Sequence, residues 1–266
     1  MAADNWGDIA RIGVFIVARE VVPEAEWWAM RPPGVSVHAA RVTAGAPWAP
    51  WRADRSGVDL APDLAAGCGA FSGIRPNVAV LAHSSSSFVG GSHWDEAAIR
   101  AMAARLPPET VATTNGLDMR LALAHLGVRR PFLVMPAWMT DGLVQSAMSY
   151  FAAFGIAVPA AWRYQPAPRW QGIAPQDLYA RGMATDQETD LLFEQVCRQC
   201  PDEADGILLA GTGFRCAGII DALEERLGRP VVAANQASLW RALEVVGWKG
   251  RVEGYGKLLA SDALTA

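Results

Sequence analysis

The feature that most constrains the fold of this chain is the regular alternation of short apolar segments with longer helical ones. The apolar segments are rich in β-branched residues, which is typical of buried strands. A chain in which strands and helices alternate forms a mostly parallel sheet with helices on its faces. The predicted strands are residues 11–18, 35–42, 77–82, 110–114, 131–136, 156–162, 206–210 and 230–233.

Two of these strands end in similar sequences, Ala-His-Ser-Ser near residue 83 and Ala-Gly-Thr-Gly near residue 211. We therefore expect an α/β fold with two related lobes whose strand ends face a shared cleft. The predicted first lobe comprises residues 1–114 plus 234–266, and the predicted second lobe comprises residues 115–233.

Composition narrows the class of protein. Hydrophobic residues make up 52% of the chain and charged residues 19%, so we expect a folded globule. The net charge of −4 and the lack of a basic block argue against nucleic acid or an anionic membrane as a partner. No apolar run is long enough to span a bilayer, and no secretory signal is evident. Four cysteines in no framework spacing favour a cytoplasmic protein.

The stretch from residue 77 to residue 91 carries the strongest chemical signal. A buried strand runs directly into His83 and four serines, which places polar groups at the carboxyl end of a sheet, where α/β sheets bind ligands. His83 is either a functional residue or a buried structural one. We expect Ser86 and Ser87 to be solvated in a loop. Ser92 and Asp95 predict the start of the next helix.

These residues resemble the aspartate/glutamate racemase superfamily, in its arylmalonate decarboxylase and maleate isomerase branch. The resemblance spans nearly the whole chain and implies two Rossmann-like lobes, an active-site cleft between them and no cofactor. The stretches that carry it are residues 78–91, 112–115, 205–232 and 231–243.

The resemblance also shows where this chain departs from the family. Typical members have one cysteine at the end of each lobe's key strand, and those positions fall on His83 and Gly211 here. Arylmalonate decarboxylases keep the second cysteine and have glycine at the first position. Maleate isomerases have an asparagine after the first strand, near the place of Glu20. Cys216 lies five residues beyond the second position, in the predicted following helix.

We expect His83 to be the principal catalytic residue, because a single protonic group suits a one-sided reaction. Decarboxylation forms an enolate that is then protonated from one face, and histidine titrates near working pH. Glu20 is a second candidate catalytic residue, as a general base, or it pairs with Arg19. Arg215 is either a carboxylate-binding residue or an exposed arginine.

A developing enolate also needs hydrogen-bond donors near its oxygens. Trp138 either walls the pocket or packs in the core, and Asn235 either completes the cleft floor or caps the last helix. The predicted substrate-binding residues are Ser84, Ser85, Thr114, Asn115, Trp138, Thr212, Gly213 and Asn235.

The sequence thus predicts a cofactor-independent enzyme that acts on a small carboxylic acid, with a decarboxylase-type lyase as the leading hypothesis. A maleate-type cis–trans isomerase or racemase, and a non-catalytic ligand-binding protein, are the alternatives. We predict no metal site, because the Cys197 and Cys200 pair has no second pair or nearby histidine. The loop around Trp48 and Trp51 is a candidate lid or homo-oligomer contact.

Overall fold

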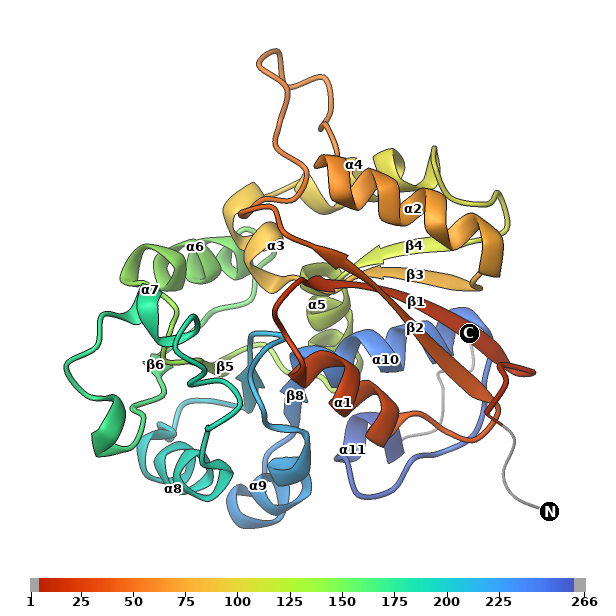
Figure 1. Ribbon diagram of the computed structural model, residues 1–266. Helices are drawn as coiled ribbons and strands as arrows, with labels where there is room; N and C mark the ends of the chain where they lie inside the picture. Colours follow the sequence, from red (N-terminus) through yellow and green to blue (C-terminus); the bar gives the residue numbers. More distant parts are fainter. Residues whose placement is uncertain (1–4, 261–266) are drawn as a thin grey trace.

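The computed structural model describes residues 5–260, and its core is two four-stranded parallel sheets (Figure 1). The first sheet has the strand order β2-β1-β3-β4, and the second has the order β6-β5-β7-β8. This arrangement confirms the predicted α/β fold of two lobes. The strands are β1 (Ala10–Val17), β2 (Val35–Val42), β3 (Val78–Leu81), β4 (Val111–Thr114), β5 (Pro131–Met135), β6 (Ala161–Arg163), β7 (Gly206–Leu209) and β8 (Val231–Ala233).

The strand order determines where a ligand can bind. In each sheet the chain moves outward from a central strand to one edge and then returns to the other side. β1 and β3 are therefore neighbours at the centre of the first sheet, and β5 and β7 are neighbours at the centre of the second. Crevices open beyond the carboxyl ends of such central strands, where the strand order reverses.

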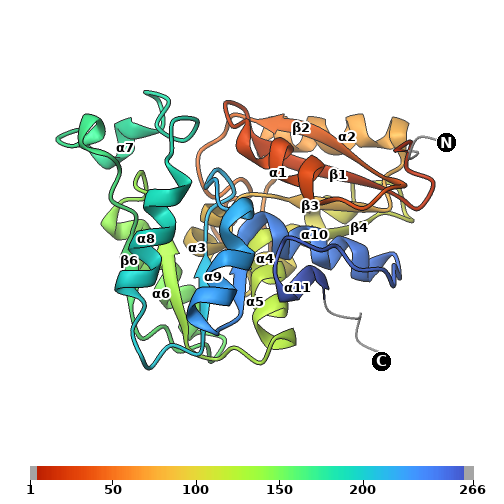
Figure 2. The same cartoon turned by 90° about the horizontal axis from the view of Figure 1, so that it is seen from below.

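Helices flank both sheets, and two of them, α5 and α10, lie between the lobes (Figures 1 and 2). α10 contacts β3 of the first sheet and β8 of the second, so one apolar core joins the two lobes. The α-helices are α1 (Val22–Met30), α2 (Pro62–Ile74), α3 (Ser84–Gly90), α4 (Trp94–Ala103), α5 (Asn115–His125), α6 (Asp141–Ala152), α7 (Pro175–Leu178), α8 (Thr189–Gln199), α9 (Ile220–Leu227), α10 (Ala234–Val245) and α11 (Lys257–Ala260).

The serine-rich stretch after β3 forms helix α3, so the predicted solvated loop is wrong. Ser86 and Ser87 are fully buried. Ser86 accepts a hydrogen bond from the Trp48 backbone amide at 2.9 Å, and Ser87 donates to Asp95 Oδ1 at 2.7 Å. Serine is a modest helix former, but these tertiary hydrogen bonds satisfy its hydroxyl groups inside the protein.

Three local predictions differ from the structure. α4 has His93 rather than Ser92 before its first residue, and the carboxylate of Asp95 is buried against other side chains instead of capping the helix. β6 is shorter than predicted and begins after Pro159, which cannot donate a ladder hydrogen bond. Cys216 precedes α9 and a short 3-10 turn, so it lies outside the helix.

No helix within residues 5–260 is long and apolar enough to cross a membrane. The lobe boundaries near residues 114 and 233 stay a proposal, because α5 and α10, which follow them, contact elements of both sheets.

Candidate functional site

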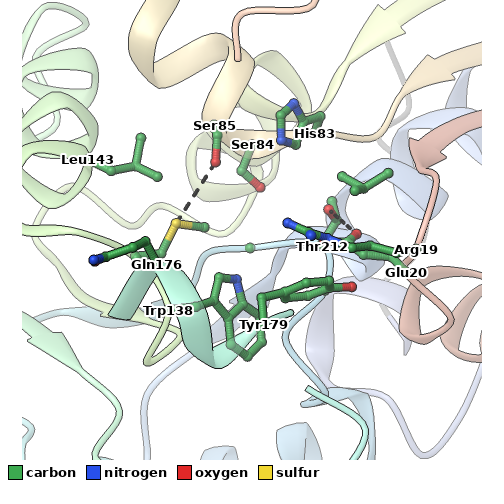
Figure 3. Close-up of a pocket in the computed structure, with 14 residues that line it drawn as sticks. Arg19, Glu20, His83, Ser84, Ser85, Trp138, Leu143, Gln176, Tyr179 and Thr212 are labelled. Carbon is green, nitrogen blue, oxygen red and sulfur yellow. Dashed lines mark hydrogen bonds between the residues drawn. The ribbon is translucent and has the colours of Figure 1, made fainter. Parts of the chain in front are cut away.

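A cavity of about 200 Å³ lies where the carboxyl ends of the two sheets meet (Figure 3). Four central strands, β1, β3, β5 and β7, are each followed by residues that line it, and α7 closes one side. The lining includes polar and apolar groups: Val17, Arg19, Glu20, His83, Ser84, Ser85, Trp138, Met139, Leu143, Gln176, Tyr179, Gly211, Thr212 and Gly213.

Glu20 is the carboxyl group of this cavity. It lies in the turn after β1, and its side chain is buried against the loop that follows β7. The Thr212 hydroxyl donates to Glu20 Oε2 at 3.4 Å, and the Tyr179 hydroxyl donates to the same carboxyl group. A Cβ atom on Gly213 would lie 2.6 Å from Glu20 Oε1, so glycine at this position makes room for the carboxyl group.

Burial raises the pKa of Glu20 from 4.5 to about 7, and the hydrogen bonds from Thr212 and Tyr179 and the charge of Arg19 offset only part of that rise. The carboxyl group is therefore partly protonated at neutral pH. A titratable group with such a pKa at a cavity wall is a candidate acid or base for proton transfer.

Arg19 brings a positive charge to the same cavity. Its guanidinium carbon lies 5.1 Å from the centroid of the Tyr179 ring, which places the cation over the aromatic face. Within residues 5–260 its guanidinium forms no ion pair with a carboxylate. Arg19 is therefore available to bind a carboxylate that enters the cavity.

His83 lies directly before α3 and borders the cavity (Figure 3). Its Nδ1 atom is 2.9 Å from Ser86 Oγ, and its ring stacks on Trp48 with centroids 4.2 Å apart and planes 19° apart. Removal from water lowers the pKa of His83 to about 3. The imidazole is therefore neutral across the physiological pH range.

Ser84 and Ser85 line the cavity in different ways. The Ser84 hydroxyl donates its hydrogen to Asn115 Oδ1 at 2.6 Å, so it has no further hydrogen to donate to a ligand. Among residues 5–260, the Ser85 hydroxyl donates only to the sulfur of Met139, a weak acceptor, at 3.9 Å (Figure 3). Of the two, Ser85 is the one that can readily donate to a ligand.

Thr114 and Asn115 lie behind the cavity wall and do not line it. The Thr114 hydroxyl donates to Asp95 Oδ1 at 2.7 Å. The Asn115 amide donates to the Ala234 carbonyl at 2.8 Å and to Ser238 Oγ at 2.9 Å. Their polar groups bind other parts of the protein, so the structure places these two residues behind the cavity lining, and their predicted role in binding stays a prediction.

Asn235 is also outside the cavity lining. Its amide donates to Glu26 Oε2 at 2.7 Å and to the carbonyl of Thr212 at 2.9 Å. Glu26 Oε1 accepts the backbone amides of Cys216 at 2.7 Å and Ala217 at 2.8 Å. α1, α10 and the loop after β7 are therefore held together directly behind Thr212.

The remaining predicted residues, Trp138, Thr212 and Gly213, line the cavity. Trp138 packs edge-on against Tyr179, with ring centroids 5.1 Å apart and planes 75° apart. Gly211 has a φ of +132°, a conformation that favours glycine. Arg215 is exposed and does not line the cavity.

Sequence reasoning missed several lining residues: Arg19 as a binding group, Met139, Leu143, Gln176 and Tyr179. Arg19 and Met139 follow predicted strand ends closely, which is a usable signal, whereas Leu143 lies in α6. Gln176 and Tyr179 come from the long proline-rich connection after β6, and no local pattern there predicts contact with the residues that follow β1.

None of the four cysteines lines the cavity. Cys68 and Cys216 are buried, and burial raises the pKa of the Cys216 thiol. Within the described part of the chain, no three side chains of the metal-binding types gather in one place.

Known structures with the same fold include maleate isomerases and arylmalonate decarboxylase. A variant of the maleate isomerase Iso from Pseudomonas putida S16, with maleate, has a TM-score of 0.79 at 18% identity, covering 96% of this chain and 99% of that one. A variant of arylmalonate decarboxylase with sulfate has a TM-score of 0.72 at 21% identity, covering 94% and 99%. A Nocardia farcinica maleate cis-trans isomerase with a covalently bound succinylcysteine intermediate has a TM-score of 0.74 at 17% identity, covering 95% and 98%. No curated protein sequence matches.

The sequence profile of the arylmalonate decarboxylase family matches residues 70–259, which is more than half of the 266 residues. The chain therefore belongs to the arylmalonate decarboxylase family. This membership confirms the predicted family branch and the predicted enzyme class, a decarboxylase-like lyase or isomerase.

Proposed function

We propose that this chain decarboxylates a small malonate-type acid without a cofactor, with Glu20 as the proton donor and Arg19 as the anchor for the retained carboxylate. The observation that carries the proposal is a buried carboxyl group with a pKa of about 7 that shares a cavity with the Arg19 guanidinium, which has no carboxylate partner among residues 5–260. A donor with this pKa is protonated often enough to give a proton and can regain it from water. Membership of a decarboxylase family supports the reaction type.

The reaction balances with the groups of the cavity and water. The bond between the α-carbon and one carboxylate breaks, its electron pair stays on the α-carbon as an enolate, and carbon dioxide leaves. Glu20 then transfers its proton to the α-carbon and becomes a carboxylate. Water returns a proton to Glu20, and the product leaves with one carboxylate still facing Arg19.

Hydrogen-bond donors for the developing enolate belong to residues that line the same cavity. Ser85 provides a hydroxyl, and the backbone amides of Thr212 and Gly213 follow β7. Loss of one such donor typically lowers the rate by roughly 100- to 1,000-fold. Trp138 offers an aromatic face for the substituent of the substrate.

We assign proton transfer to Glu20 rather than to His83, although the sequence favoured the histidine. An imidazole whose pKa is lowered to about 3 carries no extra proton at neutral pH. Neutral His83 can still donate one N–H hydrogen bond to an enolate or carboxylate oxygen.

Isomerisation through a covalent cysteine adduct is disfavoured in this chain. The Nocardia farcinica maleate isomerase holds a succinylcysteine intermediate. In this chain no thiol lines the cavity, and the nearest candidate from the sequence, Cys216, is buried and bonded through its backbone to Glu26. An acid–base route through Glu20 fits the observed groups better.

The test is a panel of 2-substituted malonates incubated with the protein in deuterium oxide. We expect release of carbon dioxide and a monocarboxylic product that carries one deuterium at the α-carbon. The variant Glu20→Gln should lower turnover by about 100-fold or more, because it cannot donate the proton.

The matched control is Glu253→Gln, the same change at an exposed glutamate outside the cavity, which should leave turnover unchanged. Full activity of Glu20→Gln would overturn the assigned role. Binding of malonates without any product would favour the non-catalytic alternative. A cytoplasmic location and a homo-oligomeric state stay predictions from the sequence.

A further inference from the structure

Ser86 lies behind the cavity and bonds to a residue that lines it. Its side chain is fully buried in the first turn of α3, and its Oγ atom is 2.9 Å from His83 Nδ1. The backbone N–H of Trp48 donates to the same Oγ atom at 2.9 Å. The hydroxyl group therefore has one donor pointing at it from the Trp48 loop and the imidazole on its other side.

These two contacts decide the direction of the hydrogen bond. Since the N–H of Trp48 can only donate, Ser86 Oγ accepts there and keeps its own proton for another partner. Within residues 5–260 that hydroxyl has no other acceptor than His83 Nδ1. A buried hydroxyl proton without an acceptor is unfavourable, so Ser86 donates to Nδ1.

We propose that Ser86 is a positioning residue that holds His83 as the neutral tautomer with its hydrogen on Nε2. Nδ1 is occupied as an acceptor, so the ring must carry its hydrogen on the other nitrogen. The stacked Trp48 ring, 4.2 Å away, covers one face of the imidazole and fixes its plane. His83 therefore presents a fixed N–H donor, and not an acceptor, to the cavity that it lines.

The catalytic consequence rests on the proposed function. A fixed Nε2–H donates to an enolate or carboxylate oxygen, whereas the other tautomer would turn a lone pair toward that negative oxygen. The His83 tautomer can be measured without any enzymatic activity. An experiment can therefore refute the role of Ser86 and the proposed decarboxylase function independently of each other.

The decisive measurement is a two-dimensional ¹H–¹⁵N spectrum of the imidazole groups in the intact protein. The chain has only four histidines, and the His83→Gln variant identifies the signals of His83 by their loss. We expect Nδ1 of His83 to resonate as an unprotonated nitrogen and Nε2 as a protonated one. A wild-type spectrum with the hydrogen on Nδ1, or with a rapidly exchanging mixture, would overturn the proposal.

The variant Ser86→Ala removes the donor and should convert the His83 signals to the other tautomer or to a mixture. Ser87→Ala is the matched control, because Ser87 is equally buried in α3 but bonds to Asp95 and to the Gly116 amide instead of His83. It should keep the wild-type His83 pattern even if it lowers stability. An unchanged pattern in Ser86→Ala would also refute the role of Ser86.

If a substrate from the malonate panel is turned over, Ser86→Ala should lower kcat by about 10- to 100-fold with a smaller change in KM. An Nε2–H tautomer in a protein with no decarboxylase activity would support the positioning role of Ser86 and refute the proposed function. A full kcat in a Ser86→Ala protein whose tautomer has changed would refute the catalytic consequence.

Discussion

At the scale of single residues, the site depends on a carboxyl group whose protonated form the fold stabilises. The pKa of Glu20 is raised from 4.5 to about 7 because burial disfavours its charged form. Folding therefore favours the protonated state, and this contribution to stability is complete below pH 4.5 and is lost as pH rises through 7. The loss amounts to about 3 kcal/mol for a shift of this size.

We therefore expect the stability of the wild-type protein, relative to Glu20→Gln, to fall between about pH 4.5 and pH 7. Urea unfolding of both proteins across this range measures the difference. The comparison removes the contributions of other buried carboxyl groups, such as Asp118, which both proteins share. A constant difference across the range would show that Glu20 titrates normally.

The contact between Gly213 and Glu20 gives a second prediction at this scale. In Gly213→Ala the new methyl group would lie 2.6 Å from Glu20 Oε1, so the carboxyl group must move. We expect decarboxylation to fall by about 10- to 100-fold and the pKa of Glu20, read from the pH–rate profile, to shift. Gly218→Ala is the control, because a methyl group there meets no atom within 4 Å and should change neither quantity.

At the scale of elements, a buried side chain of α1, Glu26, bonds this helix to the second lobe. Glu26 accepts hydrogen bonds from the Cys216 and Ala217 amides and from the Asn235 side chain. Removal of the acceptor leaves these donors buried and unpaired, and each such group costs about 1–3 kcal/mol. We expect Glu26→Ala to lower the free energy of unfolding by several kcal/mol, measured by chemical denaturation.

A double-mutant cycle measures how strongly Glu26 and Asn235 are coupled. Asn235→Ala removes one of the unpaired donors, so the double variant should be less destabilised than the sum of the two single variants. Strict additivity would mean that Glu26 and Asn235 act independently, against the observed 2.7 Å hydrogen bond.

The elements also show what the sequence could and could not predict. Strand periodicity located β1, β3 and β7 closely, and therefore located Glu20, His83 and Thr212 at neighbouring strand ends. The helical state of α3 was missed because the hydrogen bonds that satisfy its serines come from distant residues. Tyr179 was missed for the same reason, since its partner Glu20 follows β1 and no local pattern joins them.

At the scale of the whole molecule, the cavity couples ligand binding to the stability of the two-lobed fold. A ligand that binds only the folded protein stabilises it by about 2.7 kcal/mol at a free concentration 100 times its Kd. We expect substituted malonates to raise the Tm, and we expect Arg19→Gln to abolish most of this shift because the cation is lost. Arg198→Gln, at an exposed arginine outside the cavity, is the matched control.

Raised ionic strength should weaken the shift in the wild-type protein, because the cation at residue 19 is exposed to solvent. A shift that survives Arg19→Gln unchanged would place the carboxylate elsewhere in the cavity.

The backbone of Gly211 has a consequence for the handedness of the product. Its φ of +132° disfavours any side chain there, and a Cβ atom at this position would lie only 3.0 Å from Pro136 Cγ. A proton-donating side chain thus cannot be added here by simple replacement of this glycine. With Glu20 as its one assigned donor, the cavity should release a single enantiomer of the product from a prochiral malonate, and adding a second donor at residue 211 would require rebuilding the turn around Pro136.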